Sequence, residues 1–317
     1  MRVLVTGVAG FIGSNTAELL LEAGHDVVGI DNHSSSAPDN VPAGIEFHEG
    51  RSGDQSLVRS LGHLDACIHF AAHIEAGESM HVPEKFFRNN VAESLQLLEV
   101  LVEQHVPKFV FSSTATVYGP EVTLPIDETH HVEPQNPYGQ SKYMVEQALD
   151  WLARQGRINV ARLRYFNAAG GTVAHPELHT PETHLIPILL AVAAGDREFV
   201  SLYGTDYETP DGTCIRDYVH VKDLAAAHIL ALDVLNRENN LVLNLGTGTG
   251  YSNLQMIEAV ERVTGQTLDV RRTERRPGDL AASVACNDKA KAVLGWELKH
   301  SDLDTLISDA WASYRAH

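Results

Sequence analysis

Cysteine is scarce in this sequence, and the three residues present stand far apart. Cys67, Cys214 and Cys286 are an odd number and show no metal-binding spacing. A disulfide framework and a cysteine-based metal centre are therefore not expected, and a reducing, cytoplasmic location fits best. We expect no metal site at the other pair of candidate ligands, His69 and His73, because they straddle a predicted strand end instead of sharing a helix face.

Long apolar runs and basic residues are also lacking. No stretch of 18 or more apolar residues occurs, so no membrane-spanning helix is expected. The first predicted strand begins at residue 2, which leaves no room for a signal peptide. Lysine and arginine number 24 against 42 aspartate and glutamate residues, for a formal net charge of −18. This charge argues against nucleic acid and anionic membranes as partners, although local arginines can still bind an anionic substrate.

What the sequence does have is a regular alternation of strand-like and helix-like segments. With 317 residues, 44% of them hydrophobic, the chain is large enough for a full α/β core and a smaller second lobe. The alternation predicts a doubly wound parallel sheet covered by helices on both faces. Strands are expected at 2–6, 26–30, 44–48, 65–70, 108–113 and 158–165, and helices at 11–23, 53–61, 83–105 and 138–155.

After Asn167 the composition changes, and residues 171–184 read as a loop over a site. We expect two α/β domains that exchange segments and hold their ligands between them. The further elements expected are helices at 184–194, 221–235, 252–264, 287–294 and 302–315 and strands at 199–203 and 241–245. The expected domains are an NAD-binding Rossmann domain of residues 1–168 with 219–252 and a substrate domain of residues 169–218 with 253–317.

The amino-terminal segment carries a glycine-rich turn between a strand and a helix. Gly7, Gly10 and Gly13 follow the first strand, and Asp31 ends the second. Glycines let the backbone approach a pyrophosphate, and the following helix offers free N–H groups and a positive dipole end. A carboxylate at the end of the second strand accepts hydrogen bonds from ribose hydroxyls and repels a 2′-phosphate. The pattern therefore predicts NAD in preference to NADP, although the spacing G-x-x-G-x-x-G is not the commonest one.

A second pattern places Tyr138 and Lys142 four residues apart at the start of a predicted helix, on one face of it. An ammonium beside a phenol favours the phenolate, and bringing a phenol pKa from about 10 to neutrality takes about 4 kcal/mol. Such a tyrosine can remove a proton from a sugar hydroxyl while a hydride leaves the same carbon. The hydroxyl of Thr114 could bridge the phenol and the reacting oxygen. The alternative interpretation is a solvated pair on a helix and a threonine that caps a turn.

Together these patterns resemble the extended short-chain dehydrogenase/reductase family, from Met1 to about Tyr314. Within that family the chain looks like the UDP-glucose (UDP-galactose) 4-epimerases. The resemblance rests on VTGVAGFIG at 5–13, FAAHIEAGES at 70–79, NNV at 89–91, SSTATVYG at 112–119, NPYGQSK at 136–142, LRYFNAAG at 163–170, THLIP at 183–187, GTCIRDYVHVKDLA at 212–225 and RRPGD at 275–279.

The resemblance implies a role for individual residues of this chain. Catalytic roles are implied for Tyr138, Lys142 and Thr114. Contacts with NAD are implied for Gly7, Gly10, Phe11, Ile12, Gly13, Asp31, Asn32, Phe70, Ala71, Ala72, Asn89, Ser112, Tyr138, Lys142 and Tyr165. Contacts with a UDP-sugar are implied for Thr114, Tyr138, Asn167, His184, Leu185, Arg216, Tyr218, Arg276, Asp279 and Ser283.

The residues after Thr114 favour an epimerase within this family. Related dehydratases place an Asp-Glu pair there, whereas Ala115 and Thr116 follow here, so elimination of water lacks its proton shuttle. We expect an isomerase that inverts C4 of a UDP-hexose through a transient 4-keto sugar. The alternatives are a 4-epimerase of UDP-glucuronate or a UDP-pentose, a dehydrogenase, dehydratase or decarboxylase of the family, and a non-enzymatic NAD-sensing regulator.

Other positions refine this expectation. Arg51 stands where the family often has an adenine-contacting aspartate, and Ile74 stands where it often has a lysine. Ser283 is small where a tyrosine restricts relatives to UDP-glucose and UDP-galactose, which predicts activity on the N-acetylated pair as well. In the family, the helices at 89–105 and after Tyr138 pair across a dimer axis, so a homodimer is expected. The glycine-rich stretch 246–250 lacks the lysine of a phosphate loop and is interpreted as a strand-to-helix turn.

Overall fold

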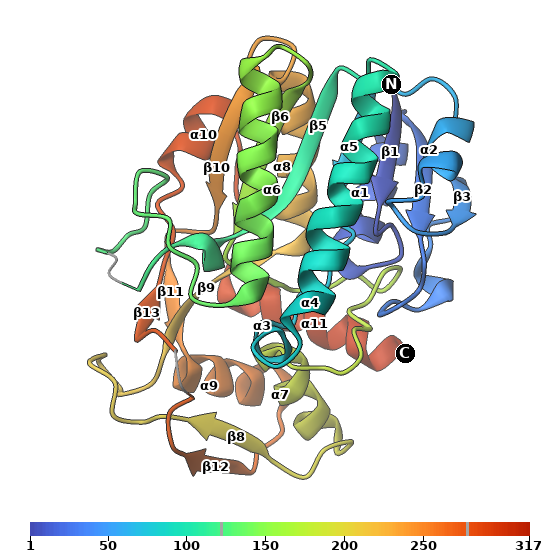
Figure 1. The fold of residues 1–317 in the computed structure, drawn as a ribbon. Coiled ribbons are helices and arrows are strands. Elements are labelled where there is room, and N and C mark those ends of the chain that lie inside the picture. Colours follow the sequence, from blue (N-terminus) through green and yellow to red (C-terminus); the bar gives the residue numbers. More distant parts are fainter. Residues whose placement is uncertain (121–122, 277–278) are drawn as a thin grey trace.

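A seven-stranded parallel sheet forms the frame of the larger lobe in the computed structural model, which describes residues 1–120, 123–276 and 279–317 (Figure 1). The chain order reverses between β1 and β4, and ligands of such sheets bind at the carboxyl ends of the strands beside this reversal. In spatial order the strands are β10 (Asn240–Leu245), β6 (Asn159–Tyr165), β5 (Lys108–Thr114), β4 (Ala66–His69), β1 (Arg2–Thr6), β2 (Asp26–Asp31) and β3 (Glu46–Glu49).

Helices cover both faces of this sheet, as the alternation of segments predicts. One face packs against α1 (Phe11–Glu22) and α8 (Val221–Val234). The other packs against α2 (Gln55–Ser60), α5 (Ser94–Glu103) and α6 (Pro137–Arg154). Each face has its own buried apolar cluster, which is why the central strands read as nearly continuous apolar runs. The predicted doubly wound α/β fold is confirmed.

The predicted helix at 83–105 is divided in the structure. A short α4 (Pro83–Phe86) leads into a π-helical stretch, η2 (Phe87–Glu93), before α5 begins. Within η2, the buried Asn90 accepts a hydrogen bond from the His73 backbone and donates one to Ser141 on α6. Wider helical turns of this kind often occur at functional sites, and the periodicity of apolar residues does not reveal them. The remaining short elements of this lobe are η1 (Pro38–Asn40), α3 (Ala76–Ser79) and η3 (Ala115–Val117).

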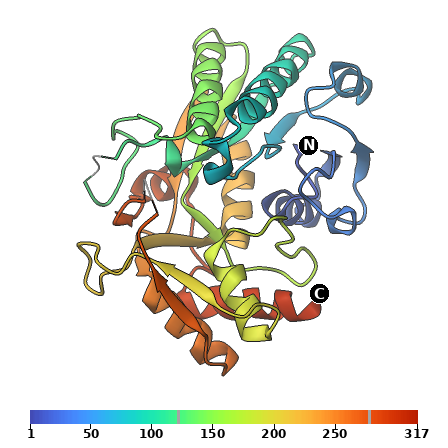
Figure 2. The ribbon, with the colours of Figure 1, turned by 60° about the horizontal axis from the view of Figure 1, so that its bottom comes forward.

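The smaller lobe lies beyond the carboxyl ends of the large sheet (Figures 1 and 2). Its apolar core joins α7 (Leu185–Ala194), α9 (Asn253–Thr264) and α11 (Leu303–Ala316). A parallel pair, β8 (Val200–Tyr203) and β12 (Val270–Thr273), lies on one side. A four-stranded sheet links the lobes and consists of β7 (Asn167–Ala169), β9 (Ile215–His220), β11 (Gly250–Ser252) and β13 (Ala282–Ser283).

Helix α10 (Asp288–Leu294) packs differently from the expectation, which placed residues 287–294 in the smaller lobe. Ala290 and Leu294 are buried with residues of α1 and α8 in the core of the larger lobe. Trp296 follows them into this core, and its indole N–H donates to the carbonyl of Asp223 at 2.8 Å. Burial of this large indole thus packs α10 against α8 and β10. None of the helices in the described ranges combines the length and hydropathy of a membrane-spanning segment.

Candidate active site

Two cavities meet at the carboxyl ends of the parallel strands. The first has a volume of about 390 Å³ and is lined by the β1–α1 turn, the ends of β2 and β5 and the start of α6. The second has a volume of about 290 Å³ and lies in the smaller lobe. Phe11, Asn167, Ala168, Glu177 and His184 line both. The shared lining shows that the two cavities adjoin.

Every cofactor contact expected from the sequence lies in the lining of the first cavity. These residues come from seven segments, which the parallel sheet and the helices beside it bring to one edge. They are Gly7, Gly10, Phe11, Ile12, Gly13, Asp31, Asn32, Phe70, Ala71, Ala72, Asn89, Ser112, Tyr138, Lys142 and Tyr165.

The three glycines of the first turn have different physical reasons to be glycine. Gly7 has a φ of +72°, and a Cβ there would lie 2.7 Å from the Ala71 nitrogen. A Cβ on Gly13 would lie 2.1 Å from the Gly7 oxygen, so neither position accepts a side chain. Gly10 differs, because the nearest atom to its Cβ would be 3.3 Å away. This contact with the Gly7 oxygen is tight but not prohibitive, and the position beside a helix N-terminus without a side-chain cap suits the approach of a pyrophosphate.

Asp31 is buried and oriented at the end of β2, next to this turn. Its carboxylate accepts hydrogen bonds from the Ala9 backbone N–H at 3.0 Å, the His33 N–H at 2.8 Å and the Ser36 hydroxyl at 3.0 Å. Two carboxylate oxygens have about four acceptor positions, so one remains for a ribose hydroxyl. The turn, the helix end and this carboxylate together fit the pyrophosphate and adenosine ribose of a dinucleotide.

The start of α6 holds Tyr138 beside the end of β5. Asn136 caps the helix by accepting from the Gly139 N–H at 2.8 Å. A Cβ on Gly139 would lie 2.7 Å from the Thr116 carbonyl oxygen, so the helix packs directly on η3. This close approach places the Tyr138 phenol beside the hydroxyl of Thr114, which itself donates to the Thr116 hydroxyl at 3.0 Å. The tyrosine and threonine of the sequence hypothesis therefore meet in the first cavity.

The electrostatics of the pair differ from the expectation. Burial raises the pKa of Tyr138 to about 12, the hydrogen bond with Thr114 partly offsets this, and the carboxylate of Glu75 adds to it. Burial also lowers the pKa of Lys142 to about 7. The Lys142 ammonium donates to the Ser112 carbonyl at 2.9 Å. The expected lowering of the Tyr138 pKa by Lys142 is therefore not present in the protein alone, and a further positive charge in the cavity is needed to favour the phenolate.

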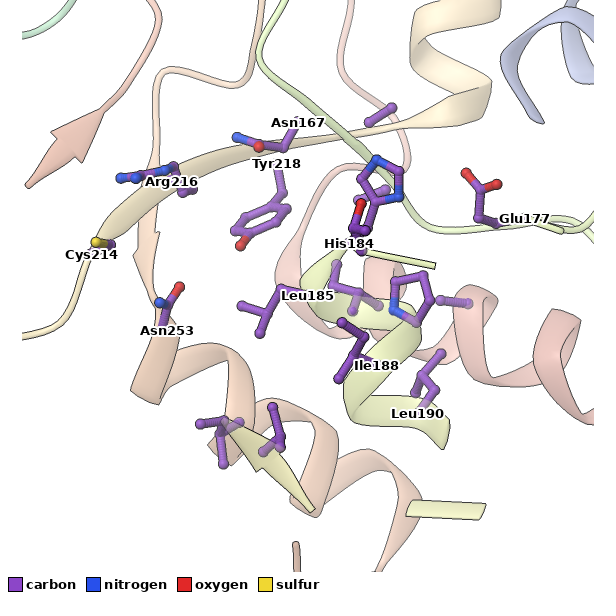
Figure 3. Close-up of a pocket in the computed structure, with 18 of the residues that line it drawn as sticks. Asn167, Glu177, His184, Leu185, Ile188, Leu190, Cys214, Arg216, Tyr218 and Asn253 are labelled. Carbon is purple, nitrogen blue, oxygen red and sulfur yellow. The ribbon is translucent and has the colours of Figure 1, made fainter. Parts of the chain in front are cut away.

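The second cavity gathers polar groups suited to a nucleoside diphosphate over an apolar floor (Figure 3). Arg216 donates to the Leu280 carbonyl at 2.8 Å and lies 3.6 Å from the Asp279 carboxylate. The Arg276 guanidinium lies 3.9 Å from the centre of the Tyr203 ring. These two guanidinium groups make a local positively charged site, suited to phosphate oxygens, in a chain of net charge −18. The substrate contacts expected here that line it are Asn167, His184, Leu185, Arg216, Tyr218, Arg276 and Asp279.

Ser283 is the one expected contact outside both linings. It lies on β13 in register with Arg216 on β9, so the two side chains share one face of the small sheet. Arg51 is not part of the first cavity lining, but it pairs with Glu93, which is. Ser52 occupies the lining at that place, and Asp54 caps α2 by accepting from two backbone N–H groups.

The glycine-rich stretch 246–250 also has a structural role that differs in detail from the expectation. It joins β10 to β11, not directly to a helix. The N–H groups of Thr247 and Gly248 donate to the buried Asp217 carboxylate at 2.7 and 3.0 Å. These donors are therefore not available to a phosphate.

Sequence reasoning predicted a loop over the site but missed the groups that hold it. The segment 171–184 crosses between the cavities, and His179 lies 2.6 Å from Glu75 beside α3. Burial opposes ionisation of Glu75, yet the hydrogen bond from His179 lowers its pKa to about 2. Glu177 lines both cavities, and burial raises its pKa. No spacing in the sequence singles out these groups, because their partners are distant along the chain.

Comparisons with known proteins agree with this site. The family model described as "NAD dependent epimerase/dehydratase family" matches residues 3–246. The chain is similar to a UDP-glucose 4-epimerase of Streptococcus mutans serotype c, with 44% identity over all of this chain and 98% of that protein.

Two solved structures extend the similarity to three dimensions. A UDP-glucose 4-epimerase of Stenotrophomonas maltophila, with bound NAD and formylated UDP-arabinopyranose, has a TM-score of 0.96 at 39% identity, covering 100% of this chain and 98% of that one. A UDP-Glc/GlcNAc 4-epimerase of Campylobacter jejuni has a TM-score of 0.87 at 35% identity, covering 99% of both chains. From its motifs, its fold and these full-length similarities, the chain belongs to the NAD dependent epimerase/dehydratase family.

Proposed function

We propose that this protein is an NAD-dependent isomerase that inverts C4 of a UDP-hexose. One observation carries the proposal. Tyr138 and Thr114 lie together in the first cavity, and the adjoining second cavity is lined by Arg216 and Arg276. A UDP-sugar bound by its diphosphate at the two arginines would extend its hexose toward the shared lining, where the phenol lies. UDP-glucose and UDP-galactose are the substrates proposed first, since the relatives named above are UDP-glucose 4-epimerases.

In the first cavity, some residues would bind NAD and others would transfer the proton. The β1–α1 turn and Asp31 would hold NAD, and Lys142 would contact its nicotinamide ribose. When bound, NAD supplies a hydride acceptor and donor for C4 and a positive ring that favours the Tyr138 phenolate. Tyr138 would remove the proton from the 4-hydroxyl. It would return the proton to the same oxygen after the 4-keto sugar has rotated and presents its other face. Thr114 would bridge the phenol and that oxygen.

A dehydratase is less well supported. Ala115 and Thr116 form η3 directly after Thr114, and neither carries a carboxyl group. Elimination of water needs a positioned acid and base next to the reacting carbons. An epimerase needs only the one proton carrier at O4, which this site provides.

The same proposal covers domains, assembly and location. We assign residues 1–168 with 219–252, together with α10, to NAD binding, and the remainder of the carboxyl-terminal half to the UDP-sugar. Leu95 on α5 and Met144 and Trp151 on α6 are exposed apolar side chains, Trp151 to 63%. These residues would form the centre of a homodimer interface. A cytoplasmic role in galactose metabolism is consistent with three free thiols and with the proposed substrates.

The test is an assay of the purified protein against a panel of UDP-sugars with analysis of the products. We expect interconversion of UDP-glucose and UDP-galactose without added cofactor and without accumulation of NADH. Denaturation should release NAD and not NADP, since Asp31 would repel a 2′-phosphate. Released NADH in stoichiometric amounts, loss of water or of carbon dioxide, or no reaction with any sugar would each contradict the proposal and favour one of the alternatives.

A further inference from the structure

Glu146 is a buried carboxylate on α6 that the proposed reaction does not use. It follows Lys142 by four residues and Tyr138 by eight, so the three side chains share one face of the helix. The Glu146 side chain is only 2% exposed. A charge at this depth is costly unless it is fully paired. Its partners therefore indicate what the carboxylate does for the fold.

These partners lie on two neighbouring strands. Arg164 on β6 donates to both carboxylate oxygens of Glu146, from Nε at 3.0 Å and from Nη2 at 2.6 Å. Ser113 on β5 donates its hydroxyl to Oε1 at 2.5 Å. Ser113 and Arg164 are register partners in the sheet, so both point to the α6 face. We call Glu146, Arg164 and Ser113 the carboxylate clamp, since one carboxylate joins α6 to both strands.

Ser113 lines the first cavity, and so do the residues on either side of it. The Ser112 carbonyl accepts the hydrogen bond from Lys142, and Thr114 lies within reach of the Tyr138 phenol. A residue of helix rises by only about 1.5 Å, so a small slide of α6 along β5 would change both contacts. Packing of apolar side chains tolerates such slides better than a forked, charge-assisted hydrogen bond does.

We propose that the carboxylate clamp is a positioning device that sets the register of α6 on β5 and thereby the distance between Tyr138 and Thr114. The inference rests on the proposed function, because that distance matters only if the two hydroxyls act on one substrate oxygen. The clamp acts through geometry, because its hydrogen bonds join α6 to both β5 and β6.

Ser113→Ala is the main test. It removes one donor but leaves Glu146 paired with Arg164, so the variant should fold. We expect kcat for UDP-glucose to fall about tenfold, as displacements of under 1 Å do at catalytic centres. The KM, the NAD bound per chain and the pH profile of kcat should stay as in the wild type. Ser113→Thr keeps a hydroxyl and should recover most of the rate.

Glu146→Gln is the second variant, since it keeps the shape of the side chain and weakens the fork. It should lower kcat by at least as much as Ser113→Ala, per chain that retains NAD. If this variant does not fold, the comparison of Ser113→Ala with Ser113→Thr alone tests the proposal. Asp150→Asn is the matched control: Asp150 is one turn further along α6 and lies 3.8 Å from Arg162, also on β6. Its kcat should stay within twofold of the wild type.

The outcomes separate the clamp from the proposed function. An active wild type whose kcat is unchanged within twofold in Ser113→Ala would overturn the clamp and leave the epimerase proposal intact. Equal losses in Asp150→Asn and Ser113→Ala would also overturn it, by pointing to general loosening of α6. A wild-type protein that converts no UDP-sugar would overturn the proposed function and, with it, the role of the clamp.

Discussion

At the scale of single residues, the Tyr138 hydroxyl is the group on which the proposed chemistry depends. Tyr138→Phe keeps the ring and removes only this oxygen, so the fold and the bound NAD should be retained. We expect kcat to fall at least 10²-fold, the usual effect of removing an acid–base group. Steady-state rates with UDP-glucose, alongside the NAD content of the denatured variant, check this. A variant with a tenth of the wild-type rate would show that another group carries the proton.

Lys142 connects the same site to stability. Burial lowers its pKa to about 7, whereas the unfolded chain has the ordinary value of about 10.4. Between these values the unfolded state binds more protons, so this group makes the free energy of unfolding rise as pH increases from about 7 to about 10. Below pH 7, Lys142 is charged in both the folded and the unfolded state, so the folded protein bears the full free-energy cost of burying the ammonium group.

Lys142→Met should therefore stabilise the NAD-free protein while abolishing turnover. At pH 7 we expect its free energy of unfolding to exceed that of the wild type by about 1–4 kcal/mol. The difference should shrink as pH approaches 10, because the wild-type lysine is then neutral in both states. Urea unfolding at a series of pH values measures this. A constant difference across that range would mean that packing, not charge, explains it.

Ser283 concerns the choice of sugar. It lies beside Arg216 in the register of the small sheet, although it is outside both cavity linings. We predict activity of the wild type on UDP-N-acetylglucosamine as well as on UDP-glucose. Ser283→Tyr should reduce kcat/KM selectively for the N-acetylated sugar, because a bulky ring would clash with the acetamido group. Equal losses on both sugars, or no wild-type activity on the N-acetylated one, would refute this assignment.

At the scale of an element, the β1–α1 turn separates a binding glycine from a folding glycine. Gly10→Ala adds a Cβ 3.3 Å from the Gly7 oxygen, a tight contact that a small shift relieves, so the variant should fold and lose NAD. Gly13→Ala would place a Cβ 2.1 Å from a backbone oxygen and should prevent correct folding. Circular dichroism, thermal unfolding and cofactor content of the two variants test the distinction. If Gly10→Ala retained NAD at wild-type levels, the pyrophosphate would not lie at this turn.

At the scale of the whole molecule, the exposed apolar residues on α5 and α6 predict self-association. Sedimentation should give twice the 34.7 kDa mass of one chain. Trp151→Glu would bury a charge in the proposed interface and should shift the protein toward the monomer. Val173→Glu is the control, because Val173 is also exposed, to 55%, but lies on another segment. A Trp151→Glu protein that remained as dimeric as the control would remove this face from the interface.

The sequence by itself determined the doubly wound fold and the main binding patterns of the first cavity. Strand and helix periodicities are local, and the glycine turn, Asp31 and the Tyr138–Lys142 spacing each operate within a few residues. Because parallel strands bring their carboxyl ends to one edge, knowledge of the segments was enough to predict that the glycine turn, Asp31 and Tyr138 meet there. Contacts such as Phe70, Asn89 and Tyr165 were implied only by the resemblance to a family. The resemblance to a family extended this prediction to Arg216 and Arg276, which no local pattern distinguishes from solvated arginines.

Only the tertiary structure decided features that depend on distant partners. The packing of α10 follows from the burial of Trp296, and the short strands β7, β11 and β13 owe their existence to pairing with β9. The raised pKa of Tyr138 follows from burial, which outweighs what its neighbour four residues along the helix could contribute. Glu146 and Arg164 are 18 residues apart, and nothing short of the folded sheet shows that they meet. Burial and long-range pairing are properties of the folded chain, which is why local reasoning stops before them.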